Sequence, residues 1–120
     1  MPALDTRNRD SPVVYICSRY SGNIERNTDL ARRYNRLAVE RGCVPLTPHL
    51  LLPQFLSEET EREKAINLDL RFLGLCQELW VCGPDVSEGM RREIDCAAEM
   101  KIPIRYIKEE EILCMRLPKA

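Results

Sequence analysis

The chain has 120 residues, of which 44% are hydrophobic and 31% charged, values typical of one globular domain. Its 18 Lys and Arg nearly balance its 19 Asp and Glu, which argues against a nucleic-acid binder and gives no reason to expect membrane binding. No apolar run reaches the roughly 20 residues that span a bilayer, and the polar segment 1–11 lacks a signal-peptide core. We therefore expect a cytoplasmic protein with a flexible tail at 1–11 and a single domain at 12–120.

Two strands and a helix are predicted in the first part of the chain. Residues 13–17 form a run that is apolar on both faces, as in a central parallel strand. A helix is expected over about 24–41, with Gly42 directly after its end. Residues 43–47 indicate a short second strand, and Pro45 places it at a sheet edge because proline cannot donate to a ladder.

The alternation of strands and helices continues in the second part. The segment 48–53, which begins and ends with proline, is interpreted as an irregular loop. A second helix is expected to reach about Leu75, starting at a capping box in 60–63 or one turn earlier at Ser57. The remaining elements are a strand at 79–82, a helix from the N-cap Ser87 to about Met100, a strand at 102–107 and a short terminal helix at 108–117.

This pattern predicts an α/β fold with a parallel sheet covered by helices on both faces. Right-handed crossovers favour the strand order 2-1-3-4, with four or five strands in total. The chain then reverses direction between the first and third strands, and ligands bind outside the carboxyl ends of strands at such a switch point. The loops expected there are 18–23 and 83–89.

The six cysteines do not suggest a metal centre or a disulfide framework. None forms a CxxC pair, and the chain has a single histidine, so we expect no metal site. Most lie in apolar runs, which favours small buried thiols in a reducing compartment. The cysteines are Cys17, Cys43, Cys76, Cys82, Cys96 and Cys114.

The segment 87–93 carries the most chemical information. It begins a helix, where free backbone N–H groups and the helix dipole favour an anion. Ser87 adds a hydroxyl, and Gly89 lets a ligand approach the backbone. Glu93 falls on the apolar face of this helix near the switch point, so it is either a site carboxylate or an ordinary surface glutamate.

Asp69 is a second anomaly, because it lies on the apolar stripe of its helix. A carboxylate there is unfavourable unless it is paired or functional, and burial would raise its pKa. A structural hydrogen bond or cap is an equally good interpretation.

Several further side chains could reach the same edge of the sheet. Tyr15 and Tyr20 could contact a ligand, although core packing also explains Tyr15. Arg19 could bind phosphate or simply be exposed, and His49 follows the second strand but has no nucleophile partner in a triad pattern. The loops lack the GxGxxG and Walker patterns, which disfavours nicotinamide dehydrogenases and P-loop kinases.

Taken together, these motifs resemble the nucleoside 2-deoxyribosyltransferase-like superfamily, in particular a small bacterial and phage branch. The resemblance covers about residues 13–107, and Ser-x-Gly-x-x-x-Glu after the third strand is its most specific part. The motifs are Val14-Tyr15-Ile16-Cys17-Ser18-Arg19-Tyr20-Ser21-Gly22, Pro45-Leu46-Thr47-Pro48-His49-Leu50, Asn67-Leu68-Asp69-Leu70, Glu78-Leu79-Trp80-Val81-Cys82-Gly83 and Ser87-x-Gly89-x-x-x-Glu93.

The resemblance implies a flavodoxin-like, Rossmann-like three-layer sandwich and cleavage or transfer of an N-glycosidic bond of a nucleoside or its 5′-monophosphate. It implies Glu93 as the nucleophile, Asp69 as an assisting acid and Tyr15 as the residue that orients the nucleophile. It implies no cofactor, no nucleic-acid polymer and a homodimer or higher homo-oligomer. The expected substrate-binding residues are Ser18, Arg19, Tyr20, Gly22, His49, Gly83, Ser87, Gly89 and Met90.

Two departures from the family pattern leave an alternative open. The family often has proline at the position of Arg19 and aspartate at that of Gln77. The alternative is a nucleotide-binding module of the same fold that senses without cleaving. A purely structural protein is a third interpretation, and two acidic residues on converging apolar faces argue against it.

Overall fold

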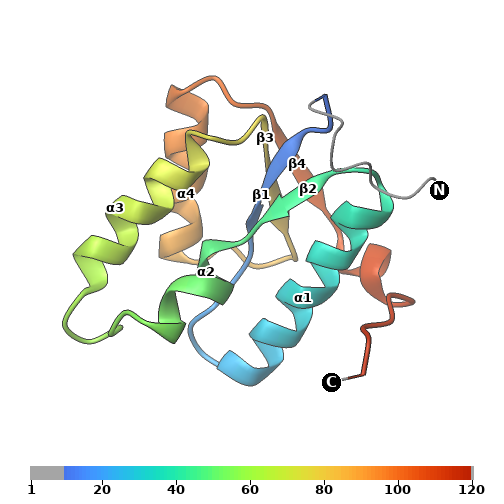
Figure 1. Cartoon of the computed structure of the whole chain (residues 1–120), viewed down its shortest axis with the longest axis horizontal. Coiled ribbons are helices and arrows are strands. Elements are labelled where there is room, and N and C mark those ends of the chain that lie inside the picture. Colours follow the sequence, from blue (N-terminus) through green and yellow to red (C-terminus); the bar gives the residue numbers. More distant parts are fainter. Residues whose placement is uncertain (1–9, 120) are drawn as a thin grey trace.

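A four-stranded parallel sheet forms the centre of the computed structural model, which describes residues 10–119 (Figure 1). The strand order β2-β1-β3-β4 confirms the predicted one, and Pro45 lies in an edge strand as expected. The tail predicted at 1–11 falls almost entirely outside the described residues. The strands are β1 (Val13–Cys17), β2 (Val44–Leu46), β3 (Glu78–Cys82) and β4 (Ile104–Ile107).

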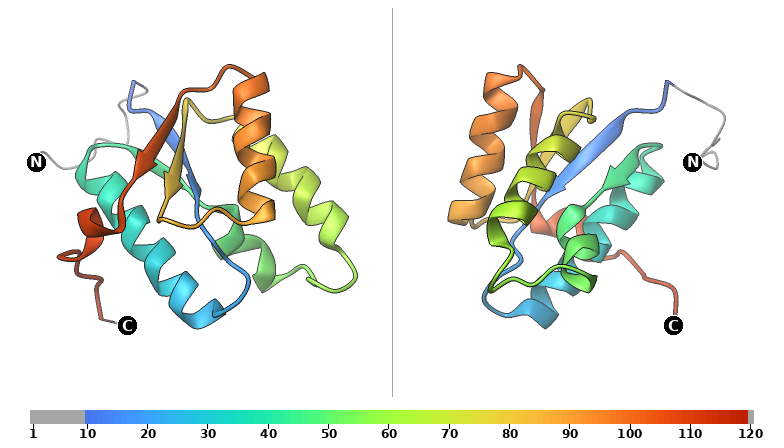
Figure 2. Two further views of the ribbon diagram at one scale, coloured as in Figure 1. Left: turned by 180° about the vertical axis from the view of Figure 1, so that it is seen from behind. Right: turned by 60° about the vertical axis from the view of Figure 1, so that its left-hand side comes forward.

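One face of the sheet is covered by α1 (Ile24–Glu40) and by the short 3-10 helix η2 (Glu109–Ile112), as the two views in Figure 2 show. Asn23 caps α1, because its side chain accepts a hydrogen bond from the backbone of Arg26 at 3.1 Å. The core between these layers is apolar, with buried Val14, Ile16, Tyr34, Leu37, Ala38, Trp80, Cys82, Ile107 and Ile112.

The other face is covered by α3 (Arg62–Leu73) and α4 (Glu88–Glu99). The strands are apolar on both faces because both faces are covered, which confirms the three-layer α/β sandwich. On α4, Met90, Ile94 and Ala97 of the expected apolar stripe are buried, whereas Ala98 of the same stripe is exposed. This second core contains Tyr15, Cys17, Leu73, Cys76, Leu79, Val81, Met90, Ile94 and Ala97.

The segment 48–53 is helical and not an irregular loop. It forms α2 (Pro48–Leu51) followed by the 3-10 turn η1 (Leu52–Gln54). Pro48 stands at the first turn, where a backbone N–H has no intrahelical partner, so proline starts this helix and does not break it.

The capping box predicted in 60–63 is also wrong. Helix α3 begins at Arg62, and its N-cap residue Glu61 makes no side-chain capping bond. Ser57 instead closes a separate turn, since its hydroxyl accepts from the backbone N–H groups of Glu59 and Thr60. The terminal helix predicted at 108–117 is limited to η2.

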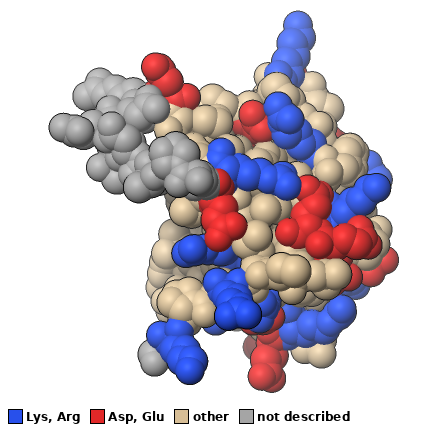
Figure 3. All heavy atoms as spheres, turned by 90° about the vertical axis from the view of Figure 1, so that its right-hand side faces the viewer, with Lys and Arg blue, Asp and Glu red and all other residues tan. Residues whose placement is uncertain are grey.

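Opposite charges are interspersed over α1 and the C-terminal segment (Figure 3). The pairs Arg26–Glu109 and Arg41–Glu111 join α1 and its end to η2. Arg41 also stacks its guanidinium 5.8 Å from the ring of Trp80. These contacts hold the C-terminal segment against the sheet.

Two further features of residues 10–119 bear on function. No helix in this part of the chain is long and apolar enough to cross a membrane, and no cluster of three or more His, Cys, Asp or Glu side chains could hold a metal. All six cysteines are free thiols, and four of them are buried.

Candidate functional site

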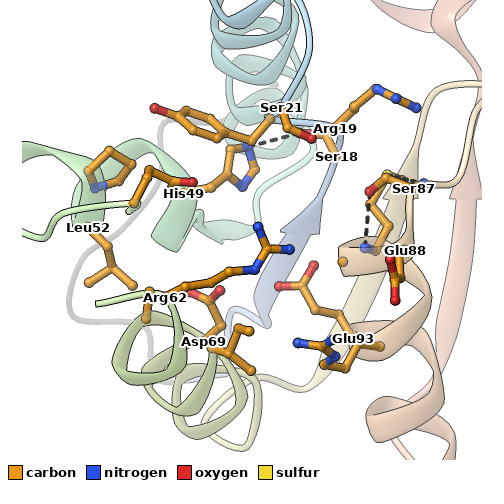
Figure 4. Close-up of a pocket in the computed structure, with 18 of the residues that line it drawn as sticks. Ser18, Arg19, Ser21, His49, Leu52, Arg62, Asp69, Ser87, Glu88 and Glu93 are labelled. Atoms are coloured by element: carbon orange, nitrogen blue, oxygen red, sulfur yellow. Dashed lines mark hydrogen bonds between the residues drawn. The ribbon is translucent and has the colours of Figure 1, made fainter. Parts of the chain in front are cut away.

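A cavity of about 500 Å³ opens at the carboxyl ends of β1 and β3 (Figure 4). This is where the strand order predicts a ligand site. One wall is the loop after β1, and the opposite wall is the start of α4. Between them lie α2, η1 and the pocket-facing side of α3. The site is therefore assembled from four separate parts of the chain.

Glu93 lies at the floor of this cavity and is held by the central strand β1. The Tyr15 hydroxyl donates a hydrogen bond to its Oε2, and the Cys17 thiol, which donates to the Met90 carbonyl at 3.8 Å, belongs to the same buried surroundings. Burial raises the pKa of Glu93 to about 7; the Tyr15 hydroxyl and the Cys17 thiol oppose that rise, and nearby Asp69 adds to it. Glu93 is thus a fixed carboxyl group that titrates near neutrality.

Strand β1 explains why a tyrosine and a thiol lie together beneath α4. Alternate residues of a strand point to the same face, so Tyr15 and Cys17 both face α4. Both side chains are fully buried, and burial, followed by the Glu93 charge, raises the pKa of Tyr15 well above its usual range. The tyrosine therefore remains a neutral donor.

Asp69 faces the cavity from α3. Its Oδ1 atom is buried and has no hydrogen-bond partner within residues 10–119. Burial raises the pKa of Asp69 to about 6, and the charge of Glu58 adds to this effect. Such a group carries a proton in a substantial fraction of molecules near neutral pH.

The loop after β1 carries a Ser–His contact. The Ser18 hydroxyl lies 3.1 Å from Nε2 of His49, and the rings of His49 and Tyr20 are 6.0 Å apart. Burial lowers the pKa of His49 to about 4, so its imidazole is neutral at physiological pH. Asn27 of α1 supports this loop by donating to the carbonyls of Tyr20 and Ser21.

The start of α4 forms the wall opposite His49. Ser87 caps the helix by accepting from the backbone N–H of Met90 at 3.2 Å, which confirms the predicted N-cap. Gly89 and buried Met90 also line the cavity. An ideal Cβ on Gly89 would come no closer than 4.0 Å to Ser87, so the backbone here stays open to a ligand.

A family model described as a domain of unknown function, DUF7768, matches residues 12–107. The chain belongs to this family. The match includes all four strands and Glu93. The comparison with curated proteins gave no match.

Among solved structures, this DUF7768 chain is similar to a 2-deoxyribosyltransferase from the psychrotolerant bacterium Bacillus psychrosaccharolyticus. The TM-score is 0.61 at 16% identity, over 80% of this chain and 72% of that chain. At this identity the likeness establishes a shared fold. That enzyme is described as a biocatalyst for synthesis of antiviral and antitumoral nucleosides.

Three residues singled out in the sequence of this DUF7768 chain lie away from the cavity. Gly22 and Gly83 are absent from its lining, and an added Cβ on Gly83 would face the Tyr34 hydroxyl at 3.6 Å. Gln77 lies at the opposite end of the sheet, where its side chain accepts from the backbone N–H of Val13 at 2.7 Å. Gln77 therefore makes no direct contact with a ligand in this cavity.

The remaining predicted residues of the DUF7768 site come together. Ser18, Arg19, Tyr20, His49, Asp69, Ser87, Gly89, Met90 and Glu93 all line the cavity, and Tyr15 supports Glu93 from beneath. Arg62, which no sequence motif singles out, also lines it. Its spacing of seven residues from Asp69 is two helical turns and was the available signal.

Replacing Ser87 by Ala should destabilise this DUF7768 domain by about 1 kcal/mol, because the Met90 N–H loses its capping acceptor. Urea denaturation followed by circular dichroism measures the change. The matched variant Ser87→Asp keeps an acceptor and should retain wild-type stability. Equal stability of the Ala variant and the wild type would contradict the capping role.

Proposed function

We propose that the protein cleaves or transfers the N-glycosidic bond of a nucleoside or nucleoside 5′-monophosphate, with Glu93 as nucleophile. The observation that carries the proposal is the pair of carboxyl groups in one cavity. Glu93 is oriented by the Tyr15 hydroxyl, and Asp69 has an unpartnered oxygen. Enzymes that break a glycosidic bond usually use two carboxyl groups in different environments.

In the first step, the Glu93 carboxylate attacks the anomeric carbon C1′ of the sugar. The C1′–N bond breaks with its electron pair going to the nucleobase, and protonated Asp69 donates a proton to that base. The transition state resembles an oxocarbenium ion, and the product is a covalent glycosyl-enzyme. The hydrogen bond from Tyr15 holds the attacking oxygen in position.

In the second step, a water molecule or another nucleobase attacks C1′ of the glycosyl-enzyme. The ester bond to Glu93 breaks, the carboxylate is regenerated, and Asp69 receives the proton of the incoming group. Water completes hydrolysis, and a base completes transfer. A cavity of about 500 Å³ accommodates a single nucleoside, so the departing base must leave before another takes its place.

The fold comparison supports this assignment at the level of architecture, because a 2-deoxyribosyltransferase shares the sheet and its covering helices. The test is incubation with nucleosides, deoxynucleosides and their 5′-monophosphates, followed by chromatography for free base. Release that disappears in Glu93→Ala supports the proposal. Binding without release from any substrate, persisting in Glu93→Ala, would instead favour a sensing module.

The pH dependence of kcat/KM should be bell-shaped, with a maximum near pH 6.5. Ionised Glu93, with a pKa of about 7, and protonated Asp69, with a pKa of about 6, are both required. The fraction of ionised Glu93 grows as pH rises, and the fraction of protonated Asp69 shrinks. Initial rates between pH 4.5 and 9 measure this profile, and activity still rising at pH 9 would contradict it.

A further inference from the structure

The charged side chains that line the cavity lack ion-pair partners. Three arginines and four acidic residues line it, and none forms an ion pair within the described part of the chain. Elsewhere on the surface, arginines such as Arg33 and Arg41 are paired. Unpaired charges that face one cavity are available to a ligand.

Arg62 is the arginine that reaches over the cavity interior. In Figure 4 its guanidinium lies between His49 on one wall and Glu93 on the other, whereas the Arg19 side chain points away from both. The Arg62 side chain makes no hydrogen bond or ion pair with any residue in 10–119. Five N–H donors on an exposed side chain that lines the cavity are therefore free.

Helix α3 places Arg62 on the same face as Asp69. Arg62, Ala65, Ile66 and Asp69 follow the spacing i, i+3, i+4 and i+7, and all line the cavity. Seven residues of helix rise separate the Cα atoms of Arg62 and Asp69 by about 10 Å along the axis. This face of α3 thus presents a cation, then the apolar side chains of Ala65 and Ile66, then a carboxyl group. Such an arrangement suits a flat heterocycle with polar edges.

We propose that Arg62 determines base specificity by donating to a carbonyl oxygen of an oxo-nucleobase: guanine, hypoxanthine, uracil or thymine. The inference rests on the proposed function, in which Asp69 acts at the departing base. A guanidinium has donors only, so it pairs with both O6 and N7 of guanine or hypoxanthine, and with O4 alone of uracil or thymine. An amino group at that position, as in adenine or cytosine, leaves donors facing donors.

A phosphate group is the competing ligand for an arginine. The base is favoured because Arg62 shares one face of α3 with Asp69, which places both on the leaving-group side of Glu93. The phosphate is attached to the far side of the sugar from that bond. A base carbonyl and a phosphate oxygen therefore predict different results when nucleosides are compared with their 5′-monophosphates.

The test measures equilibrium binding of inosine and adenosine, and of 2′-deoxyuridine and 2′-deoxycytidine, by calorimetry. The full chain carries Glu93→Gln to prevent turnover. We expect inosine to bind about 5- to 150-fold more tightly than adenosine, the range for one bidentate contact, and 2′-deoxyuridine to bind more tightly than 2′-deoxycytidine through a single contact to O4. Arg62→Met should bring each ratio close to one, and Arg62→Lys should restore part of it. Arg71→Met, at the exposed end of α3 and outside the cavity, should keep the wild-type ratio.

Inosine and adenosine 5′-monophosphates form the second arm. An Arg62→Met variant that loses the affinity gained from phosphate but keeps the base ratio would overturn the proposal, as would equal binding of oxo- and amino-nucleosides by the parent. Absence of binding by all four nucleosides would also overturn it. Base release by the wild type is assayed separately. A preference for oxo-nucleosides without release of free base supports the role of Arg62 and contradicts the proposed catalysis. Release of free base without that preference supports the catalysis and contradicts the role of Arg62.

Discussion

Glu93→Gln should lower the rate of base release by roughly 10⁴-fold or more, the order of loss seen when a nucleophile is removed. Gln keeps an acceptor for the Tyr15 hydroxyl, so the fold and the cavity persist. Intact-protein mass spectrometry of a quenched reaction should show a glycosyl adduct on the wild type and none on the variant. Glu99→Gln, at the exposed end of the same helix, is the matched control.

The same variant should gain stability above neutral pH. The pKa of Glu93 is raised from 4.5 to about 7 in the folded protein, so folding favours its protonated form. That contribution is complete below pH 4.5 and is lost as pH rises through 7. Gln lacks the ionisation, and its advantage should reach the order of 3 kcal/mol above pH 7. Urea unfolding of both proteins at pH 5 and pH 8 measures this stability difference. Base release that persists in Glu93→Gln would show that another group is the nucleophile.

Asp69→Asn should reduce kcat by about 10²- to 10⁴-fold for ordinary bases, the usual contribution of a general acid. An amide cannot donate a catalytic proton, so the alkaline limb of the pH profile should disappear as well. A nucleoside of 7-methylguanine, whose base leaves without needing a proton, should be cleaved almost as fast by the variant as by the wild type.

Glu63→Gln is the control for Asp69, since Glu63 is exposed on α3 and does not line the cavity. It should leave the rates for both kinds of leaving group unchanged. An equal loss for 7-methylguanine and ordinary nucleosides in Asp69→Asn would mean that Asp69 binds substrate without protonating the base.

The sheet was predictable because its signals are local. Runs such as 13–17 are apolar on both faces, and only a covered central strand requires that pattern. Asp69 was detectable for the converse reason, as a charge on an apolar stripe. Within α3, however, Ala65 and Ile66 line the cavity together with Asp69, and Leu73 is the buried residue of the helix.

Two errors have physical explanations. Pro48 is ambiguous in the sequence, because proline marks either an interruption or the first turn of a helix. Arg62 by itself gives no signal, because an arginine at a helix start resembles an ordinary solvated residue until its neighbours in space are known. Contacts between distant segments, such as Ser18 with His49, leave no local pattern.

The bond between Tyr15 and Glu93 joins residues 78 positions apart and links the first strand to the last long helix. Such a contact forms only after the intervening chain has been closed into a loop, which makes it entropically expensive during folding. A partly folded chain with isolated helices would have both carboxyl groups but no oriented nucleophile. Under the proposed mechanism, base release in a refolding experiment would therefore return only after α4 has packed against β1.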